Sequence, residues 1–232
     1  MTVPLYFSRA RLKQDASIRA LTPLLLGKTG RGGASQQPGH HLVWSLFADS
    51  ASRQRDFLWR EMAPGTFLIL SARPPQNLHG LFELAEPKPF APALAAGDAL
   101  GFSLRANPVV RRRSSPNSRG IKHDVVMDAI RSRPSGERAS HRLAAVQEQG
   151  LNWLGRQGDR YGFALEPNQV QVCGYQQHRI ARGRSDKPMS FSTLDFEGAL
   201  NVRDPEAFLP AIANGFGSAK AYGCGLMLIR RA

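Results

Sequence analysis

Residues 189–206 read MSFSTLDFEGALNVRDPE, and this stretch says most about the fold. The part from Met189 to Val202 predicts a long strand. Immediately after it, Asp204 suits the cap of a helix, Pro205 suits the first helical turn, and Glu206 adds a favourable negative charge there. The stretch therefore predicts a strand that leads directly into a helix.

The segments around this stretch complete a strand-helix-strand-strand-helix-strand order in the second half of the chain. Strands are expected at Ala99–Val110, Val170–Val172 and Gly225–Arg230, with a helix over Ala139–Arg156. Gly150 weakens that helix, and Pro210 should kink the helix that follows Asp204. The order is that of the ferredoxin-like fold, which many RNA-binding domains adopt.

The first half of the chain shows the same order less completely. The expected elements are strands at Leu5–Leu12, Phe57–Trp59 and Thr66–Leu70, a helix from Pro38 through Phe47, and a short helix over Asn77–Leu84. The proline-rich segment Glu86–Pro92 is the best candidate for a domain boundary. We therefore predict an α+β fold with two tandem ferredoxin-like (RRM-like) domains, residues 1–88 and 97–232. A doubly wound α/β sheet is the alternative, and the hairpins argue against it.

The charge of the chain indicates a polyanionic partner. Lys and Arg total 31 against 18 Asp and Glu, a formal net charge of +13. No run of about 18 apolar residues is present, and the N-terminus lacks a signal-peptide stretch, so nucleic acid is favoured over a membrane. Cys173 and Cys224 suggest neither a disulfide framework nor a zinc site, so a cytoplasmic protein is expected.

Two basic segments are candidates for phosphate contact. Residues 105–142 contain ten Lys or Arg against three acidic residues, although a solvated basic loop is the alternative interpretation. The candidates in this segment are Arg105, Arg111, Arg112, Arg113 and Lys122. A second segment, residues 177–187, should form a basic hairpin tip with the candidates Arg179, Arg182, Arg184 and Lys187.

A glycine-rich segment near the C-terminus, residues 215–226, reads GFGSAKAYGCGL. It matches neither a dinucleotide-binding fingerprint nor a P-loop. Such a segment is most often a tight connection between a helix and a strand. Alternatively, its backbone N–H groups approach RNA phosphates, with Gly217, Ser218 and Lys220 as the contact residues.

His40 is the best candidate for acid–base chemistry. At 100° per residue, His40 falls at the edge of the apolar face of its helix, one turn before Trp44, while His41 points away with Ser45. An imidazole at such an edge is partly desolvated yet reachable, which suits proton transfer near neutral pH. A surface or capping role is the plainer alternative. No His-Glu-x-x-His pair, magnesium-binding acidic cluster or nucleophile elbow is visible, so neither a metal nor a cofactor is expected.

Five segments together resemble one protein family. They are Tyr6-Phe7-Ser8-Arg9, His40-x-x-x-Trp44-x-Leu46-Phe47, Leu104-Arg105-Ala106-Asn107-Pro108, Phe196-Glu197-Gly198-Ala199-Leu200 and the glycine-rich segment 215–226. In this order they resemble the CasE family, the repeat-RNA endoribonucleases of type I-E CRISPR systems. The resemblance covers nearly the whole chain.

The resemblance implies tandem ferredoxin-like domains that bind a CRISPR repeat hairpin and cleave at the 3′ base of its stem without a metal. His40 matches the family's catalytic histidine. The 2′-OH attacks the adjacent phosphate, which gives 2′,3′-cyclic phosphate and 5′-OH ends. A basic hairpin, here residues 177–187, enters the RNA major groove. The crRNA product is kept, and the other Cascade subunits are the implied protein partners.

Two positions depart from the family's pattern. Gln37 stands where some members have a tyrosine, and Ser45 stands where some have a lysine. The second catalytic group is therefore open, with Lys28, Arg31 and His41 as nearby candidates. A non-catalytic, basic RNA-binding protein of the same fold is the alternative function.

Overall fold

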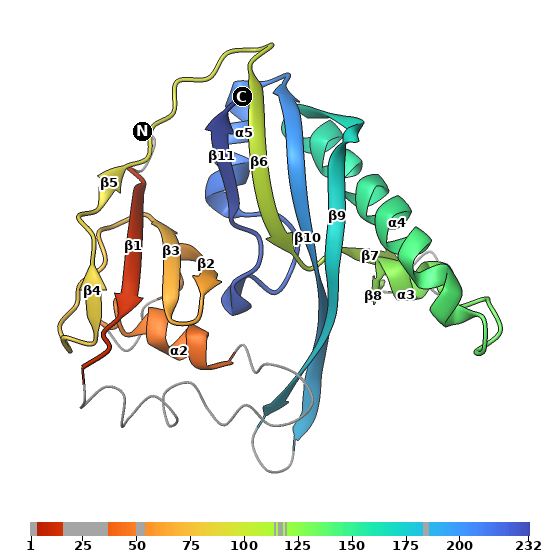
Figure 1. Cartoon of the computed structure of the whole chain (residues 1–232), viewed down its shortest axis with the longest axis horizontal. Helices are drawn as coiled ribbons and strands as arrows, with labels where there is room; N and C mark the ends of the chain where they lie inside the picture. The colour runs from red at the N-terminus through yellow and green to blue at the C-terminus, as the bar shows by residue number, and fades with distance from the viewer. Residues whose placement is uncertain are drawn as a thin grey trace.

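The computed structural model describes residues 4–15, 37–49, 54–113, 115, 118, 120–182 and 186–232. Within these ranges the chain forms two larger antiparallel sheets and one small two-stranded sheet, with helices packed against them (Figure 1). Every strand pairing is antiparallel, so the predicted α+β class is confirmed and the doubly wound parallel sheet is excluded.

The first sheet has the strand order β2-β3-β1-β4. Its strands are β1 (Tyr6–Leu12), β2 (Phe57–Ala63), β3 (Thr66–Ser71) and β4 (Phe82–Leu84), with β5 (Lys88–Pro89) paired to β1. Burial alternates along β1, so Ala10 and Leu12 face a core that Leu42 and Val43 of α2 (Gln37–Trp44) complete. The strands and the helix predicted here are confirmed within a few residues.

The predicted helix over Asn77–Leu84 is wrong. The Asn77 side chain accepts a hydrogen bond from the Phe82 amide and donates one to the Phe82 carbonyl, at 3.3 and 2.6 Å. Gly80 takes a left-handed φ of +63° inside the resulting turn. These side-chain hydrogen bonds stabilise a turn instead of a helix. Phe82 then pairs with Leu12 at the start of β4.

The second sheet has the order β11-β6-β10-β9, which is that of a ferredoxin-like module. Its strands are β6 (Ala99–Ala106), β9 (Phe163–Arg182), β10 (Asp186–Val202) and β11 (Met227–Arg231). The associated helices are α3 (Val125–Ile130), α4 (Arg138–Tyr161) and α5 (Pro205–Asn214). The predicted strand Ala99–Val110 is divided, because β7 (Val109–Arg112) leaves the sheet and pairs with β8 (Ile121–Asp124) instead.

Local chemistry explains the ends and the course of these helices. The Asp204 carboxylate accepts hydrogen bonds from the amides of Glu206 and Ala207 at 3.0 and 3.1 Å, so the predicted cap of α5 is confirmed. Gly150 does not interrupt α4. A Cβ at that position would lie 2.5 Å from Cγ1 of Val172, so the glycine lets β9 approach the helix closely.

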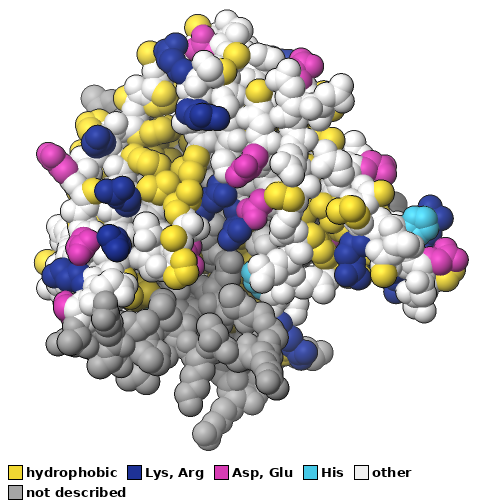
Figure 2. Space-filling view, viewed as in Figure 1, with side chains coloured by type: hydrophobic (Ala, Val, Ile, Leu, Met, Phe, Trp, Pro, Cys, Tyr) yellow, Lys and Arg dark blue, Asp and Glu magenta, His cyan; other side chains and the backbone are white. Residues whose placement is uncertain are grey.

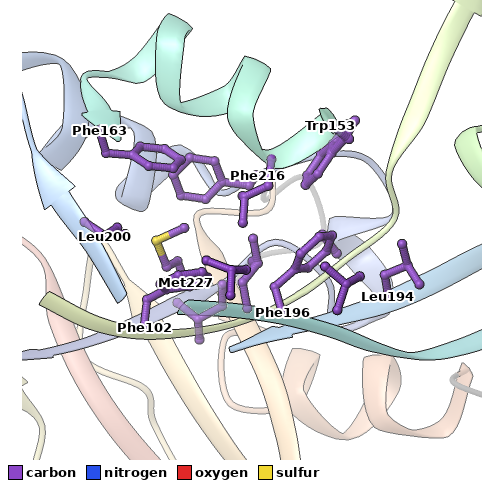
Figure 3. Packing of buried hydrophobic residues seen from close by; sticks show 14 of the residues in the cluster. Phe102, Trp153, Phe163, Leu194, Phe196, Leu200, Phe216 and Met227 are labelled. Atoms are coloured by element: carbon purple, nitrogen blue, oxygen red, sulfur yellow. The ribbon is translucent and has the colours of Figure 1, made fainter. Parts of the chain in front are cut away.

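The main core lies between the second sheet and its helices. Trp153, Phe163, Phe196 and Phe216 interdigitate there, with Met227 of β11 beside them (Figure 3). The same cluster includes Leu58 and Leu70, which belong to β2 and β3 of the first sheet. The two sheets therefore share apolar packing. The domain limits 1–88 and 97–232 remain a prediction.

Candidate active site

His40 lies on α2 at a junction between the two sheets, and Trp59 of β2 organises this junction. Trp59 packs beneath the helix, where a Cβ on Gly39 would lie 2.8 Å from its ring. Trp59 Nε1 also donates a hydrogen bond of 3.2 Å to the Ala221 carbonyl, in the short helix η1 (Lys220–Tyr222). A Cβ on Gly223 would lie 3.1 Å from the same ring. One indole thus brings the catalytic candidate and the glycine-rich segment together.

The His40 ring is half-buried among other rings. Its centroid lies 5.8 Å from that of Tyr222, 6.1 Å from that of Trp44 and 5.4 Å from that of His41. His41 is exposed, so the edge position of His40 and the outward direction of His41 are both confirmed. His40 Nδ1 is buried, and no described residue forms a hydrogen bond with it.

The surroundings favour a neutral imidazole. Burial lowers the pKa of His40 below 6.5, and His41 and Arg55 lower it further by charge repulsion. The Ala221 carbonyl acts in the opposite direction, although no hydrogen bond of good geometry joins it to the ring. A histidine with this balance accepts a proton at neutral pH.

Two cations, Arg55 and Lys220, belong to the same junction as His40. The Lys220 ammonium donates a hydrogen bond of 2.6 Å to the Asn214 carbonyl, and its pKa is lowered by burial and then by Arg55. Arg55 is half-buried, and burial lowers the pKa of its guanidinium. Among the described residues, no carboxylate contributes to the pKa of His40, Lys220 or Arg55. No described carboxylate therefore balances the positive charges of the site, and this suits an anionic ligand.

A row of rings leads from His40 toward the long hairpin. Tyr222 lies 5.4 Å from Phe191 of β10, and Phe191 stacks at 4.9 Å on His178 of β9. His178 Nε2 lies 3.0 Å from Thr193 Oγ1. Tyr222 and Phe191 are only partly buried, so both keep an accessible surface for a flat ligand.

The glycine-rich segment is tied to the end of β6. The Ser218 amide donates to the Asn107 carbonyl at 3.3 Å, and the Asn107 side chain donates to the Ser192 carbonyl at 2.7 Å. Gly217 has a φ of +77°, and a Cβ there would lie 2.9 Å from the Asn107 carbonyl oxygen. These contacts support the interpretation of the segment as a tight connection. Contact of Gly217, Ser218 and Lys220 with RNA stays a prediction.

The cations predicted in residues 105–142 have different surroundings. Arg105 forms a bidentate ion pair with Asp195, at 2.8 and 2.7 Å. Its guanidinium is therefore already engaged in an interaction that stabilises the fold. Arg112 pairs with Asp128 at 2.6 Å, and Lys122 donates to Ser218 Oγ at 3.1 Å. The exposed residues of β7 and the segment after it include Arg111 and Arg113. On the face shown in Figure 2, Lys and Arg are dispersed rather than gathered into one patch.

The basic hairpin is only partly described. β9 and β10 extend past the rest of the second sheet, toward the end of the molecule that carries α2 (Figure 1). Arg179 is exposed on β9 and pairs in register with Ser190. Arg184 and the side chains of Arg182 and Lys187 lie outside the described residues.

The candidates for a second catalytic group are also only partly described. Lys28 and Arg31 lie outside the described residues, as does the side chain of Gln37. The Ser45 hydroxyl donates to the Leu42 carbonyl at 2.7 Å, so it caps its own helix. The sequence indicates a catalytic role neither for Arg55, which belongs to no motif, nor for Tyr222, whose proximity to His40 depends on the fold.

Comparison with known proteins identifies the family. The family model for CRISPR associated protein matches residues 5–231. The CRISPR-associated endoribonuclease Cse3 of Thermus thermophilus is 30% identical over 230 residues, which cover 90% of this chain and 98% of the relative. The chain belongs to the CasE family of CRISPR-associated proteins. The CRISPR system Cascade subunit CasE of Escherichia coli K12 is 26% identical over 81% of this chain and 88% of the relative.

Solved structures of CasE relatives support the same fold. A structure of CRISPR endoribonuclease Cse3 bound to a 19-nucleotide RNA matches with a TM-score of 0.63 at 24% identity, and it covers 98% of this chain and 99% of that one. The predicted ferredoxin-like architecture is therefore confirmed. Among the described helices of this CasE-family chain, none has the length and apolar character needed to cross a membrane.

Proposed function

We propose that this protein is an endoribonuclease that binds CRISPR repeat hairpins and cleaves at the 3′ base of the stem without a metal. One observation carries the proposal: a half-buried histidine with a lowered pKa lies at the junction of α2 and η1, where Arg55 acts electrostatically on both His40 and Lys220. The chain belongs to a family in which a relative is a CRISPR-associated endoribonuclease. Among the described residues, no three His, Cys, Asp or Glu side chains gather into a potential metal site.

The proposed chemistry is transesterification by the RNA itself. Neutral His40 accepts the proton of the 2′-OH, the 2′-oxygen bonds to phosphorus, and the 5′-oxygen of the next nucleotide leaves. The products carry a 2′,3′-cyclic phosphate and a 5′-OH. An acid–base group contributes roughly 10²–10⁴-fold to such a step. Alignment of the 2′-OH and cations near the phosphate supply the rest, and we propose Lys220 for the second task.

The proposal extends to the partners. One relative is a Cascade subunit, and another occurs in a structure bound to RNA. We infer that this protein keeps its crRNA product and joins other Cascade subunits. A cytoplasmic location is part of the proposal, since that is where CRISPR RNA and its partner subunits are made. Exposed Arg179, together with the hairpin it belongs to, is the proposed contact with the RNA stem.

Substitution of His40 tests the catalytic assignment. His40→Ala should reduce single-turnover cleavage of the host's own repeat RNA by at least about 100-fold, because acid–base catalysis is lost. Affinity for the hairpin should stay within a few-fold, because one imidazole contributes little to an interface of many phosphate contacts. Exposed His79→Ala is the matched control and should cleave at nearly the normal rate. Cleavage by His40→Ala above about a tenth of the normal rate would contradict the assignment.

A modified substrate separates binding from chemistry in the same assay. A 2′-deoxy nucleotide just upstream of the cut should block cleavage and leave binding intact, and EDTA should change neither. A product with a 5′-phosphate would instead indicate attack by water. The alternative, a non-catalytic RNA-binding protein, predicts no cleavage of the repeat by the unmodified chain under any of these conditions.

A further inference from the structure

Arg55 has an unusual position for an arginine. Its Nη1 is buried, and no described residue accepts a hydrogen bond from it. Other half-buried or buried arginines have acceptors: Arg60 donates to Ser103 Oγ, Arg73 to Asp56 and Arg105 to Asp195. A buried charged donor without a partner costs free energy, and such groups usually have a functional reason.

The fold does not need the Arg55 guanidinium to fix its own segment. The neighbouring Asp56 is held by Arg73 at 2.7 Å, and Arg73 also donates to the Phe47 carbonyl at 3.0 Å. The ring of Phe57, at the start of β2, stacks on Phe47 with centroids 4.4 Å apart. These contacts hold the start of β2 in place, and none of them involves Arg55.

Arg55 acts electrostatically on the candidate site. Phe57 lies 5.2 Å from Trp44, whose ring lies 6.1 Å from that of His40. Arg55 is close enough to both His40 and Lys220 to repel a positive charge on either. The groups that face His40 are thus His41 and Trp44 on its own helix, Arg55 before β2 and Tyr222 on η1, while Lys220 of η1 interacts with Arg55. The surroundings fit a negatively charged group between these elements.

We propose that Arg55 is a catalytic residue whose free N–H binds a non-bridging oxygen of the scissile phosphate. This inference rests on the proposed endoribonuclease function. The 2′-O–P bond forms while the bond to the 5′-oxygen breaks, His40 takes the 2′-OH proton, and the 5′-oxygen takes a proton from solvent water. Arg55 remains protonated throughout and supplies charge and a directed hydrogen bond as the phosphate becomes more negative. The missing acceptor of Arg55 is then the substrate.

Four variants test the role of Arg55: Arg55→Ala, Arg55→Lys, His40→Ala and Arg9→Ala. Arg9 is exposed on β1, with its side chain on the opposite face from the core that α2 covers, so Arg9→Ala controls for the loss of one positive charge. We expect Arg55→Ala to lower the single-turnover rate by roughly 100-fold, as for the loss of one donor to a developing oxyanion. Binding of the 2′-deoxy hairpin should weaken only a few-fold. Arg55→Lys should be intermediate, because it keeps the charge and loses the planar fork.

Two further measurements separate catalysis from structural support. In the free protein, the pKa of His40 measured by NMR should rise in Arg55→Ala, because the repulsion from Arg55 is lost. Millimolar guanidinium should restore part of the cleavage by Arg55→Ala and none of that by His40→Ala. If Arg55→Ala does not fold, Arg55→Gln, which keeps a similar shape without the charge, takes its place in every measurement.

The outcomes distinguish the two proposals. An inactive His40→Ala together with a normal rate for Arg55→Ala overturns the role of Arg55 and leaves the proposed function standing. An active His40→Ala overturns the proposed function itself. A rate loss in Arg9→Ala equal to that in Arg55→Ala would show a general charge effect, which also overturns the assignment. Loss of rate with retained binding, a raised His40 pKa and rescue by guanidinium supports it.

Discussion

At the scale of single residues, His40 shows what a sequence can predict about a site. Its place at the edge of an apolar helical face follows from the period of the helix alone, and the structure confirms it. Burial lowers its pKa most, followed by the adjacent His41 and by Arg55, and of these causes the local sequence indicates only His41. The lowered pKa favours the neutral imidazole, which suits the acceptance of a proton.

This lowered pKa predicts the pH dependence of cleavage. At RNA concentrations far below saturation, the cleavage rate should rise with pH through a midpoint below 6.5 and then level off, because this rate reports the free protein, in which only neutral His40 accepts the 2′-OH proton. Arg55→Ala should move that midpoint upward. The rate is measured between pH 5 and 8 on the repeat RNA, with hairpin binding followed in parallel as the control. A midpoint above 6.5 in the unmodified chain would contradict a general-base role for the buried ring.

Other single residues could not be assigned from the sequence. The charge of Arg105 suggested a phosphate contact, but its partner Asp195 comes from β10, and only the strand pairing brings the two together. Arg55 belongs to no recognisable pattern. Tyr222 lies inside the glycine-rich segment, yet its distance from His40 depends on how that segment packs against Trp59.

At the scale of secondary structure, Trp59 is the link between α2 and η1. Trp59→Phe should lower the cleavage rate several-fold while hairpin binding changes little, because the hydrogen bond to Ala221 is lost and Tyr222 is less well positioned. Stability should fall by about 1 kcal/mol for the missing hydrogen bond. Cleavage kinetics and urea unfolding check both effects. Phe102→Leu, in the core of the second sheet, is the control; an equal loss of rate there would show that stability alone matters.

Most strands and helices were predictable because they carry periodic apolar residues or clear caps. The exceptions have local physical causes. Asn77 forms side-chain hydrogen bonds that favour a turn over a helix. Leu143 lies within the helix predicted over Ala139–Arg156 but is 81% exposed, because the first turns of α4 precede the part that packs on the sheet. Periodicity identifies a helix, but it does not show how far a helix extends beyond its support.

At the scale of the whole molecule, the candidate active site combines residues from both sheets. His40 is carried by the helix of the first sheet, whereas Lys220 and Tyr222 are carried by the connection between α5 and β11 of the second. Arg60 of β2 joins the two sheets: it donates to Ser103 Oγ on β6 at 2.8 Å and lies 4.0 Å from Asp195 on β10. A sequence read one domain at a time does not indicate such a junction, because the residues that form it come from both halves of the chain.

Substitution of Arg60 tests how strongly the sheets are coupled. Arg60→Ala should lower the free energy of unfolding by about 2 kcal/mol, the typical range for lost hydrogen bonds to a charged group, because its side chain is only 10% exposed. Cleavage should fall together with stability, since His40 and Lys220 lose their fixed relation. Urea unfolding gives the first quantity, and the control Arg9→Ala should stay within roughly 0.5 kcal/mol of the unmodified chain. A double-mutant cycle with Asp195→Asn then isolates the pair. A coupling energy near zero would mean that the apolar contacts of Leu58 and Leu70 alone hold the site together.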